Sequence, residues 1–248
     1  MIFDKTKLWS EYPVVAFDTE TSGPYPIESE IIELGAVKWL NGKIIDRFQT
    51  LLKPSTILQP DNIRIHGITN EMVADAPQMS SQILNFCEFI DNTILIAHHA
   101  PFDLGFLTLD IERAGLRFPN CLHLCTSLIS RALLPTSNHK LQTMIKELKL
   151  VGGEAHRAYD DAYACFQVFE KLGDQATLGK LQEIQTKKLE WENYKIISNP
   201  DSKMKSLMKA AQQKKTIQIV YPAGSTKSKP RPVTVYGIVR NPDGDYIH

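Results

Sequence analysis

A chain of 248 residues, 43% of them hydrophobic, is long enough to bury one large core, or one core plus a smaller module. No run approaches 18 consecutive apolar residues and 23% of the residues are charged, which excludes a transmembrane helix and general disorder. The 28 basic and 28 acidic residues cancel, yet residues 174–248 hold 13 Lys and Arg against 7 Asp and Glu, so the tail is basic and residues 1–173 are acidic. A basic tail favours a polyanion such as nucleic acid, although a solvated charged surface is the commoner cause.

The cysteines and the first residues indicate a reduced, cytoplasmic protein. The sequence begins without the basic and then apolar run of a secretory signal, and the four cysteines have no framework spacing. His123 lies between Cys121 and Cys125, but no second Cys/His pair accompanies it, so we expect a structural role rather than a zinc site.

Three strands are predicted at the beginning of the chain. Residues 13–18 form a short apolar run, typical of a central strand that is buried on both faces. Residues 30–40 and 43–52 flank Asn41-Gly42, a dipeptide that tolerates positive φ and suits a type I′ hairpin turn.

After a proline-bearing loop, the apolar periodicity predicts helices and one more strand. The expected elements are a helix at 80–90, a strand at 93–97, and helices at 101–114, 127–134, 139–150 and 158–172. A strand followed directly by a helix suggests a parallel βα unit, so we expect an α/β layered domain.

The character of the sequence changes after Gly173. We expect a helical basic linker at 174–215 and a short β-rich extension at 216–248, following a main domain at 1–173. The expected elements in this part are helices at 178–194 and 203–214, strands at 216–221 and 232–240, and a flexible basic segment at 223–231. Trp191 and Tyr194 stand among lysines where they could stack on bases, but packing of an amphipathic helix on the main domain is the favoured interpretation.

Acidic residues follow two of the predicted strands. Asp18 and Glu20 are two residues apart, so the pleat of the first strand directs both carboxylates to one face. Asp103 begins the helix after the strand at 93–97 and points toward the same sheet edge. Taken alone, the pair also fits loop capping and Asp103 also fits a partner of the helix dipole.

A fourth acid begins the helix at 158–172. Asp161 shares its helical stripe with apolar residues and should face inward, whereas Asp160 shares its stripe with polar residues and should face water. Carboxylate-only ligation suits Mg²⁺ or Mn²⁺, and two such ions support an in-line phosphoryl displacement. His156, just before this helix, then suits the general base that takes a proton from water.

These residues resemble those of the DEDDh 3′–5′ exonucleases, the group that includes the proofreading epsilon subunit of bacterial DNA polymerase III. The resemblance covers about residues 13–172. It rests on Asp18-Thr-Glu20, on Asp103 within His-His-Ala-Pro-Phe-Asp, on His156 five residues before Asp161, and on Ile-Ile-Glu-Leu-Gly-Ala-Val at 31–37, His66-Gly67-Ile68-Thr69 and Cys125-Thr126.

The resemblance implies a ribonuclease-H-like fold, a mixed central sheet flanked by helices whose first three strands are antiparallel and are followed by parallel βα units. It also implies that two Mg²⁺ or Mn²⁺ ions are held by Asp18, Glu20, Asp103 and Asp161, Asp103 partly through water, and that His156 is the base. The residues expected at the nucleotide are Thr21, Asp61, His66, Gly67, His99 and Phe102. His99 departs from the family, which more often has Asn at this position.

The function that we expect is hydrolysis of single-stranded or frayed nucleic-acid 3′ ends to nucleoside 5′-monophosphates, in DNA proofreading or repair, with a DNA polymerase or repair complex as partner and no membrane. The alternatives are an RNA 3′-end processing exoribonuclease and a catalytically silent end-binding module, against which the complete set of acids argues. Residues 214–221 and 231–238 also show a faint resemblance to the beginning of a WYL-type ligand-sensing domain, although a plain extension is favoured and the chain could be truncated.

Overall fold

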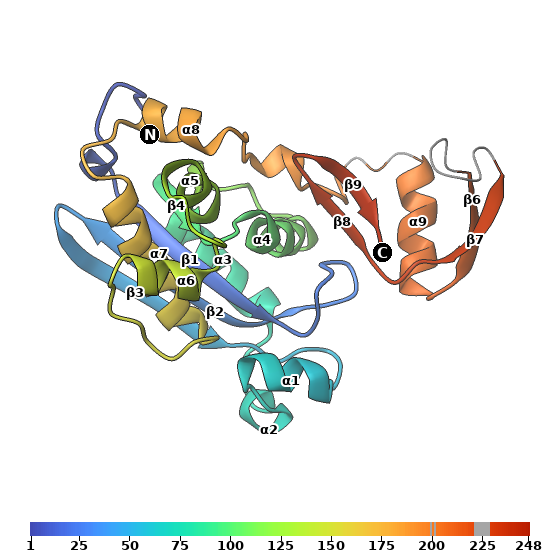
Figure 1. Ribbon diagram of the computed structural model, residues 1–248. Helices are drawn as coiled ribbons and strands as arrows, with labels where there is room; N and C mark the ends of the chain where they lie inside the picture. The colour runs from blue at the N-terminus through green and yellow to red at the C-terminus, as the bar shows by residue number, and fades with distance from the viewer. Residues whose placement is uncertain (199, 201, 221–228) are drawn as a thin grey trace.

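The computed structural model describes residues 1–198, 200, 202–220 and 229–248. Its centre is a five-stranded sheet in the order β3-β2-β1-β4-β5 (Figure 1). The strands are β1 (Val14–Thr21), β2 (Ile31–Leu40), β3 (Lys43–Leu51), β4 (Thr93–Ala97) and β5 (Cys121–Cys125). The first three are antiparallel, whereas β4 is parallel to β1 and β5 to β4, which confirms the predicted mixed sheet.

Helices cover both faces of this sheet, as predicted for an α/β domain (Figure 1). They are α1 (Pro60–His66), α2 (Asn70–Val73), α3 (Met79–Ile90), α4 (Pro101–Arg113), α5 (Thr126–Leu133), α6 (Leu141–Glu147) and α7 (Ala158–Leu172), preceded by a 3₁₀ turn, η1 (Trp9–Glu11). The sequence did not predict η1, α1, α2 or β5, but the other elements of this part are confirmed to within a few residues.

Strand β1 separates two hydrophobic cores. Val15 and Phe17 pack in the core that α3 and α4 cover. Val14 and Ala16 pack in the core on the opposite side, under α7. Because side chains alternate along a strand, the same alternation places Asp18 and Glu20 on the α7 side of the sheet. Strand β1 continues to Thr21 rather than ending at residue 18, so both acids belong to the strand itself.

Helix α7 begins almost in contact with strand β2. A Cβ atom on Gly35 would lie 2.2 Å from the backbone nitrogen of Tyr159 and 2.3 Å from the carbonyl carbon of Ala158. Gly35 is also the residue of β2 that pairs with Asp18. A glycine at this position therefore lets the first turn of α7 approach the strand that carries the acids.

The predicted helix at 178–194 is wrong in its second half. Helix α8 (Leu178–Gln185) ends at Thr186, whose φ of 61° is left-handed, and only a 3₁₀ turn, η2 (Trp191–Asn193), follows. Trp191 and Tyr194 are buried in the same core as α3 and α4, so they pack on the main domain and are not exposed for base stacking. The division after residue 173 stays a prediction.

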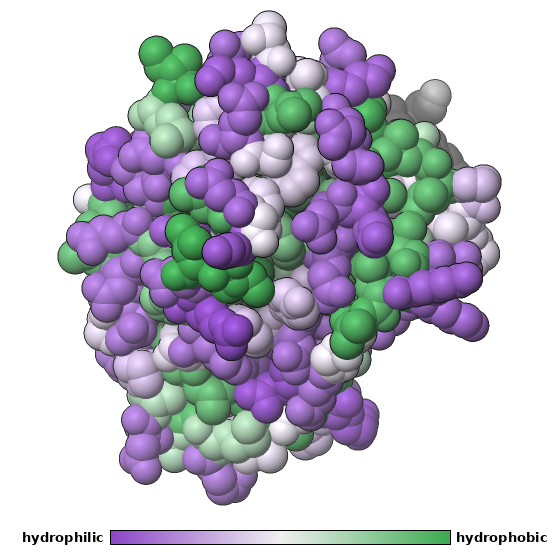
Figure 2. Space-filling view, turned by 90° about the vertical axis from the view of Figure 1, so that its left-hand side faces the viewer, coloured by the Kyte–Doolittle hydropathy of each residue, from purple (hydrophilic) through white to green (hydrophobic). Residues whose placement is uncertain are grey.

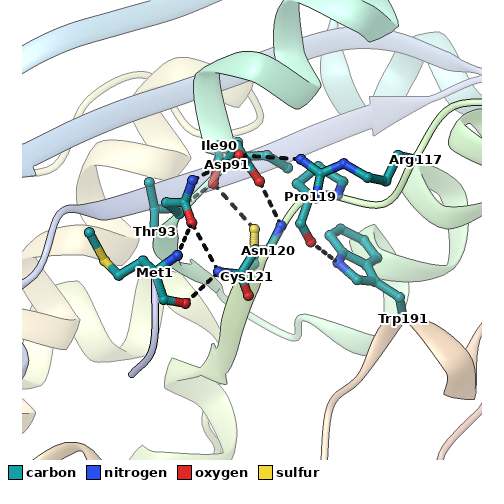
Figure 3. Close-up of polar contacts among 10 residues, drawn as sticks. Met1, Ile90, Asp91, Thr93, Arg117, Pro119, Asn120, Cys121 and Trp191 are labelled. Carbon is teal, nitrogen blue, oxygen red and sulfur yellow. Dashed lines mark hydrogen bonds and ion pairs between the residues drawn. The ribbon is translucent and has the colours of Figure 1, made fainter. Parts of the chain in front are cut away.

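The beginning of β5 is tied to its surroundings by polar contacts (Figure 3). The backbone N–H of Asn120 donates to Asp91 Oδ1 at 2.7 Å, and its side-chain amide donates to the Met1 carbonyl oxygen at 2.7 Å. Trp191 Nε1 donates to the Pro119 carbonyl oxygen at 2.9 Å. His123, within β5, is buried and bonds through Nδ1 to the Leu189 carbonyl oxygen at 2.9 Å, which agrees with the structural role expected for it.

The basic tail contains α9 (Ser202–Gln212), a two-stranded sheet of β6 (Thr216–Val220) and β7 (Pro230–Thr234), and another of β8 (Ile238–Asn241) and β9 (Gly244–Ile247). The predicted strand at 232–240 is therefore wrong, because residues 235–237 separate β7 from β8. Most of the predicted flexible segment at 223–231 lies outside the described residues.

The tail packs beside α4 and the loop that follows β1 (Figure 1). Ile27 and Leu109 share a core with apolar residues of α9 and β8. The Glu112 carboxylate accepts hydrogen bonds from the backbone N–H groups of residues 196–198, at 2.8, 3.0 and 2.8 Å. The ring of Tyr25 stacks on His248 at a centroid distance of 4.9 Å.

Hydrophilic residues surround smaller hydrophobic patches on the face seen in Figure 2. None of the described helices is long and apolar enough to cross a bilayer. The four cysteines are free thiols.

Candidate active site

The structure brings the predicted acids and the histidine together. A cavity of about 170 Å³ is lined by Asp18, Glu20, Asp103, His156 and Asp161, with Thr19, His98, His99 and Phe102. Strand β1, helix α4, helix α7 and the loop before α7 each contribute to it, so segments up to 143 residues apart in the chain meet there.

The two acids of β1 repel their neighbours. Burial and the charges of Asp103 and Glu20 raise the pKa of Asp18 well above its usual range. Burial and the charge of Asp161 raise the pKa of Glu20 to about 8. Both carboxylates are costly in this position unless positive charge compensates them.

Asp103 is held in place by Thr19. The Thr19 hydroxyl donates to Asp103 Oδ1 at 2.8 Å, and the Thr19 backbone N–H donates to the same oxygen at 3.1 Å. These bonds favour the charged carboxylate, but burial outweighs them and raises the pKa of Asp103 to about 7. The strand that carries Asp18 and Glu20 thus also orients the acid of α4.

Asp161 faces inward, as its helical stripe predicted. It is 9% exposed, and burial raises its pKa, although the hydrogen bond from the backbone N–H of His156 to Oδ2 at 3.1 Å acts in the opposite direction. Asp160 is half-buried and accepts a hydrogen bond from the backbone N–H of Glu154 at 3.0 Å, so it shapes the preceding loop instead of facing water freely.

His156 is exposed at the rim of the cavity. Its backbone has a left-handed φ of 62°, which turns the chain directly before α7. A ring nitrogen of His156 and one carboxylate oxygen each of Glu20 and Asp161 lie within 4.8 Å of one another. This spacing allows either proton transfer or direct ligation of a metal ion by the ring.

A buried ion pair anchors this loop, and the sequence analysis gave it no role. Arg157 donates from Nε and Nη2 to Glu33 of β2 at 3.2 and 2.9 Å, and the backbone N–H of Ala158 donates to Glu33 Oε2 at 3.1 Å. Glu33 pairs with Glu20 in the β1–β2 ladder and its side chain is 1% exposed. An acid in the middle of an apolar strand was the available signal, since such a buried charge requires a partner.

His66 offers an unused hydrogen-bond donor. Its Nδ1 accepts from the backbone N–H of Ile68 at 3.0 Å, so in the neutral ring Nε2 carries the proton. Burial lowers the pKa of His66, and Nε2 is buried with no partner among the described residues. Gly67, with φ of 71°, ends α1 in the left-handed conformation that directs the chain back toward Ile68.

The remaining predicted substrate residues divide into two groups. Phe102 and His99 line the cavity. Thr21, Asp61, His66 and Gly67 do not. The Thr21 hydroxyl donates to the Gly23 carbonyl oxygen at 2.8 Å, and Asp61 is an exposed residue of α1 that pairs with Arg64.

The chemistry of the carboxylates suits a site that binds divalent cations. Four acids share the site, and burial raises the pKa of each one. Within the described residues, the only group whose ligand atoms lie close enough together for one metal ion is Glu20, Asp161 and His156, which leaves out Asp18 and Asp103 and includes the histidine. Oxygen ligands in this number are typical of Mg²⁺ and Mn²⁺ sites.

Residues 15–169 match the family model described as exonuclease. The chain belongs to the exonuclease family. It is 36% identical over 167 residues to the PolC-type DNA polymerase III of Bacillus cereus, which covers 67% of this chain and 12% of that protein, and 36% identical over 181 residues to the Bacillus subtilis protein, which covers 70% and 12%. This exonuclease domain therefore spans about an eighth of the length of those relatives.

Solved structures agree with this assignment. An exonuclease X in complex with 5′ overhanging duplex DNA superimposes with a TM-score of 0.53 at 26% identity, covering 70% of this chain and 98% of that one. E. coli exonuclease I in complex with a dA16 oligonucleotide has a TM-score of 0.56 at 17% identity, covering 66% and 42%, and shows the shared fold. The exonuclease is thus of the DEDDh type that its sequence resembles.

Proposed function

We propose that this protein is a 3′–5′ exonuclease that releases nucleoside 5′-monophosphates from single-stranded or frayed DNA ends with two Mg²⁺ or Mn²⁺ ions. The observation that carries the proposal is the convergence of Asp18, Glu20, Asp103, Asp161 and His156 on one cavity. The PolC-type relatives and the DNA complex of exonuclease X support DNA as the substrate.

Each residue has a separate task in the proposed reaction. Asp18, Glu20 and Asp161 would hold the cations, and Asp103, oriented by Thr19, would complete the set. When bound, the cations supply positive charge to the attacking and leaving oxygens of the phosphodiester. His156, at the open rim, accepts the proton of the attacking water, and its exposure lets that proton pass to solvent.

Phe102 lines the cavity and His66 does not, and both are proposed to contact the terminal nucleotide. The unpaired Nε2–H of His66 is a donor for a phosphate or sugar oxygen, and a donor that stays buried without a partner is costly. Phe102 presents an apolar ring at the cavity wall for the sugar or base. DNA proofreading or repair in the cytoplasm, beside a DNA polymerase or repair complex, is the proposed setting.

Hydrolysis of matched 3′-labelled and 5′-labelled DNA and RNA oligonucleotides, in Mg²⁺, Mn²⁺ or EDTA, tests the proposal. Stepwise loss of 3′ nucleotides from DNA in Mg²⁺ or Mn²⁺ only is expected, with Asp18→Ala as the inactive control. Faster degradation of RNA would favour the exoribonuclease, while binding without hydrolysis by the wild-type protein would favour the silent module.

A further inference from the structure

A second, larger cavity adjoins the catalytic one. It has a volume of about 940 Å³ and shares His98, His99, His156 and Asp161 with the catalytic cavity, so the two cavities are adjacent. Helix α5, the loop before α6 and helix α6 form its remaining walls. The volume of the second cavity is several times the 170 Å³ of the catalytic cavity.

The charges of this second cavity are opposite to those of the catalytic one. Arg131 of α5 and Lys140, directly before α6, both line it, and Asp161 is the only acid among its described lining residues. The side chains of Arg131 and Lys140 form no hydrogen bond or ion pair with any other described residue. Two exposed, unpaired cations beside an acidic site suit a phosphate ligand.

The wall that carries Lys140 is fixed in place. His98 bonds through Nε2 to the carbonyl oxygen of His139 at 2.8 Å and through Nδ1 to the Thr126 hydroxyl at 2.8 Å. His139 itself lies 3.0 Å from the Ser130 hydroxyl through Nδ1. The loop before α6 is therefore tied to His98, which follows β4, and to α5, and these contacts hold the backbone next to Lys140.

We propose that Arg131 and Lys140 form a subsite for the phosphate that lies on the 5′ side of the scissile one. This inference rests on the proposed function: when an enzyme removes the 3′-terminal nucleotide, any backbone phosphate outside the catalytic cavity belongs to the 5′ side of the strand. The ligand class is thus an oligonucleotide with at least two internucleotide phosphates, and its bases make no difference to the contact.

Thymidine oligomers test the subsite directly. The dinucleotide has only the scissile phosphate, whereas the trinucleotide adds the phosphate on its 5′ side. The wild-type kcat/KM is expected to rise about tenfold or more from dinucleotide to trinucleotide, and the Arg131→Gln/Lys140→Gln double variant should lose most of that gain through KM. The matched control, Arg117→Gln/Lys180→Gln, removes two exposed cations that line neither cavity and should keep the gain.

A binding measurement separates this inference from the proposed function. The anisotropy of a labelled thymidine hexamer in EDTA requires no turnover, so it remains decisive even if the wild-type protein hydrolyses nothing. The double variant should bind about tenfold more weakly for each side chain removed, and the slope of log affinity against log salt should decrease by about 0.7 for each. An unchanged affinity, or an unchanged gain from dinucleotide to trinucleotide, would overturn the subsite.

Discussion

The Arg157 guanidinium donates two hydrogen bonds to the Glu33 carboxylate. Arg157 is the residue directly after His156. The pair links the loop before α7 to the strand beside the catalytic acids. The pair therefore restrains the residue next to His156 at the edge of the cavity.

Arg157→Gln should destabilise the protein by about 3–5 kcal/mol, because it leaves a buried carboxylate without its cation. The Glu33→Gln/Arg157→Gln double variant should recover part of that loss, since two neutral amides replace the lone charge. Urea denaturation measures both effects. Equal stability of Arg157→Gln and the wild type would show that the pair contributes nothing.

Two neighbouring acids of α7 should differ sharply in their effect on activity. Asp161→Asn should lower kcat/KM by at least about 100-fold, because Asp161 lines the cavity, whereas Asp160→Asn should change it less than about threefold. Steady-state hydrolysis of a DNA oligonucleotide checks the pair. Similar losses in both variants would contradict the assigned facing of the helix.

His156→Ala distinguishes the two roles that the geometry allows for the ring. As a base, His156 should contribute roughly 10²–10⁴-fold to kcat, and its loss should flatten the acid limb of the pH–rate profile while Mn²⁺ affinity in calorimetry stays nearly the same. A large loss of Mn²⁺ affinity with the acid limb retained would instead make His156 a ligand.

Gly35→Ala should displace the beginning of α7 from strand β2, because its Cβ would lie 2.2 Å from the Tyr159 nitrogen. Overpacking of this kind costs about 1–3 kcal/mol, and activity should fall with it because α7 carries Asp161. Gly105→Ala is the matched control: its Cβ would lie 3.5 Å from Pro26 Cγ, an ordinary contact, and alanine favours the helix interior by about 1 kcal/mol. Melting temperatures should move in opposite directions for the two variants.

Glu20 and Asp103 should contribute less to the stability of the metal-free protein as the pH rises. The pKa of Glu20 rises from 4.5 to about 8 on folding and that of Asp103 from 3.8 to about 7, so the folded state binds more protons between about pH 4 and pH 8. Their contribution is complete below about pH 4 and is lost as the pH rises through 7 and 8. Denaturation in EDTA across this range measures it, and Mg²⁺ at pH 8 should reverse the loss. A Glu20→Gln/Asp103→Asn variant whose stability in EDTA changes with pH just as that of the wild type does would contradict these shifts.

Local sequence predicted the elements whose signals are strong. The hairpin at Asn41-Gly42 and the inward face of Asp161 follow from turn chemistry and helical periodicity, and the structure has both, with φ of 51° and 80° in the turn. Helix α1 was not predicted because it lies in a proline-bearing segment. Strand β5 was not predicted because it has only five residues and a histidine at its centre.

The site was predictable as a set of residues but not as a set of contacts. The order and spacing of the acids indicated shared cations, whereas the bond from Thr19 to Asp103 and the ion pair of Glu33 join segments far apart in the chain. Such partners depend on how strands and helices pack, which periodicity in one segment does not encode. Of the residues expected at the nucleotide, His99 and Phe102 line the cavity. The roles of Thr21, Asp61, His66 and Gly67, which do not line it, stay predictions.

The stacking of His248 on Tyr25 joins β9 to the loop that leaves the catalytic strand. Gly237 packs against the same tyrosine, and a Cβ atom on Gly237 would lie only 2.2 Å from the Tyr25 ring. A glycine at this position therefore allows the contact. Tyr25 follows Glu20 by only five residues. The end of the chain therefore contacts the loop directly after the strand that carries the acids. A ligand that displaces the last residues of the basic tail would therefore break this stack beside the strand that carries Asp18 and Glu20.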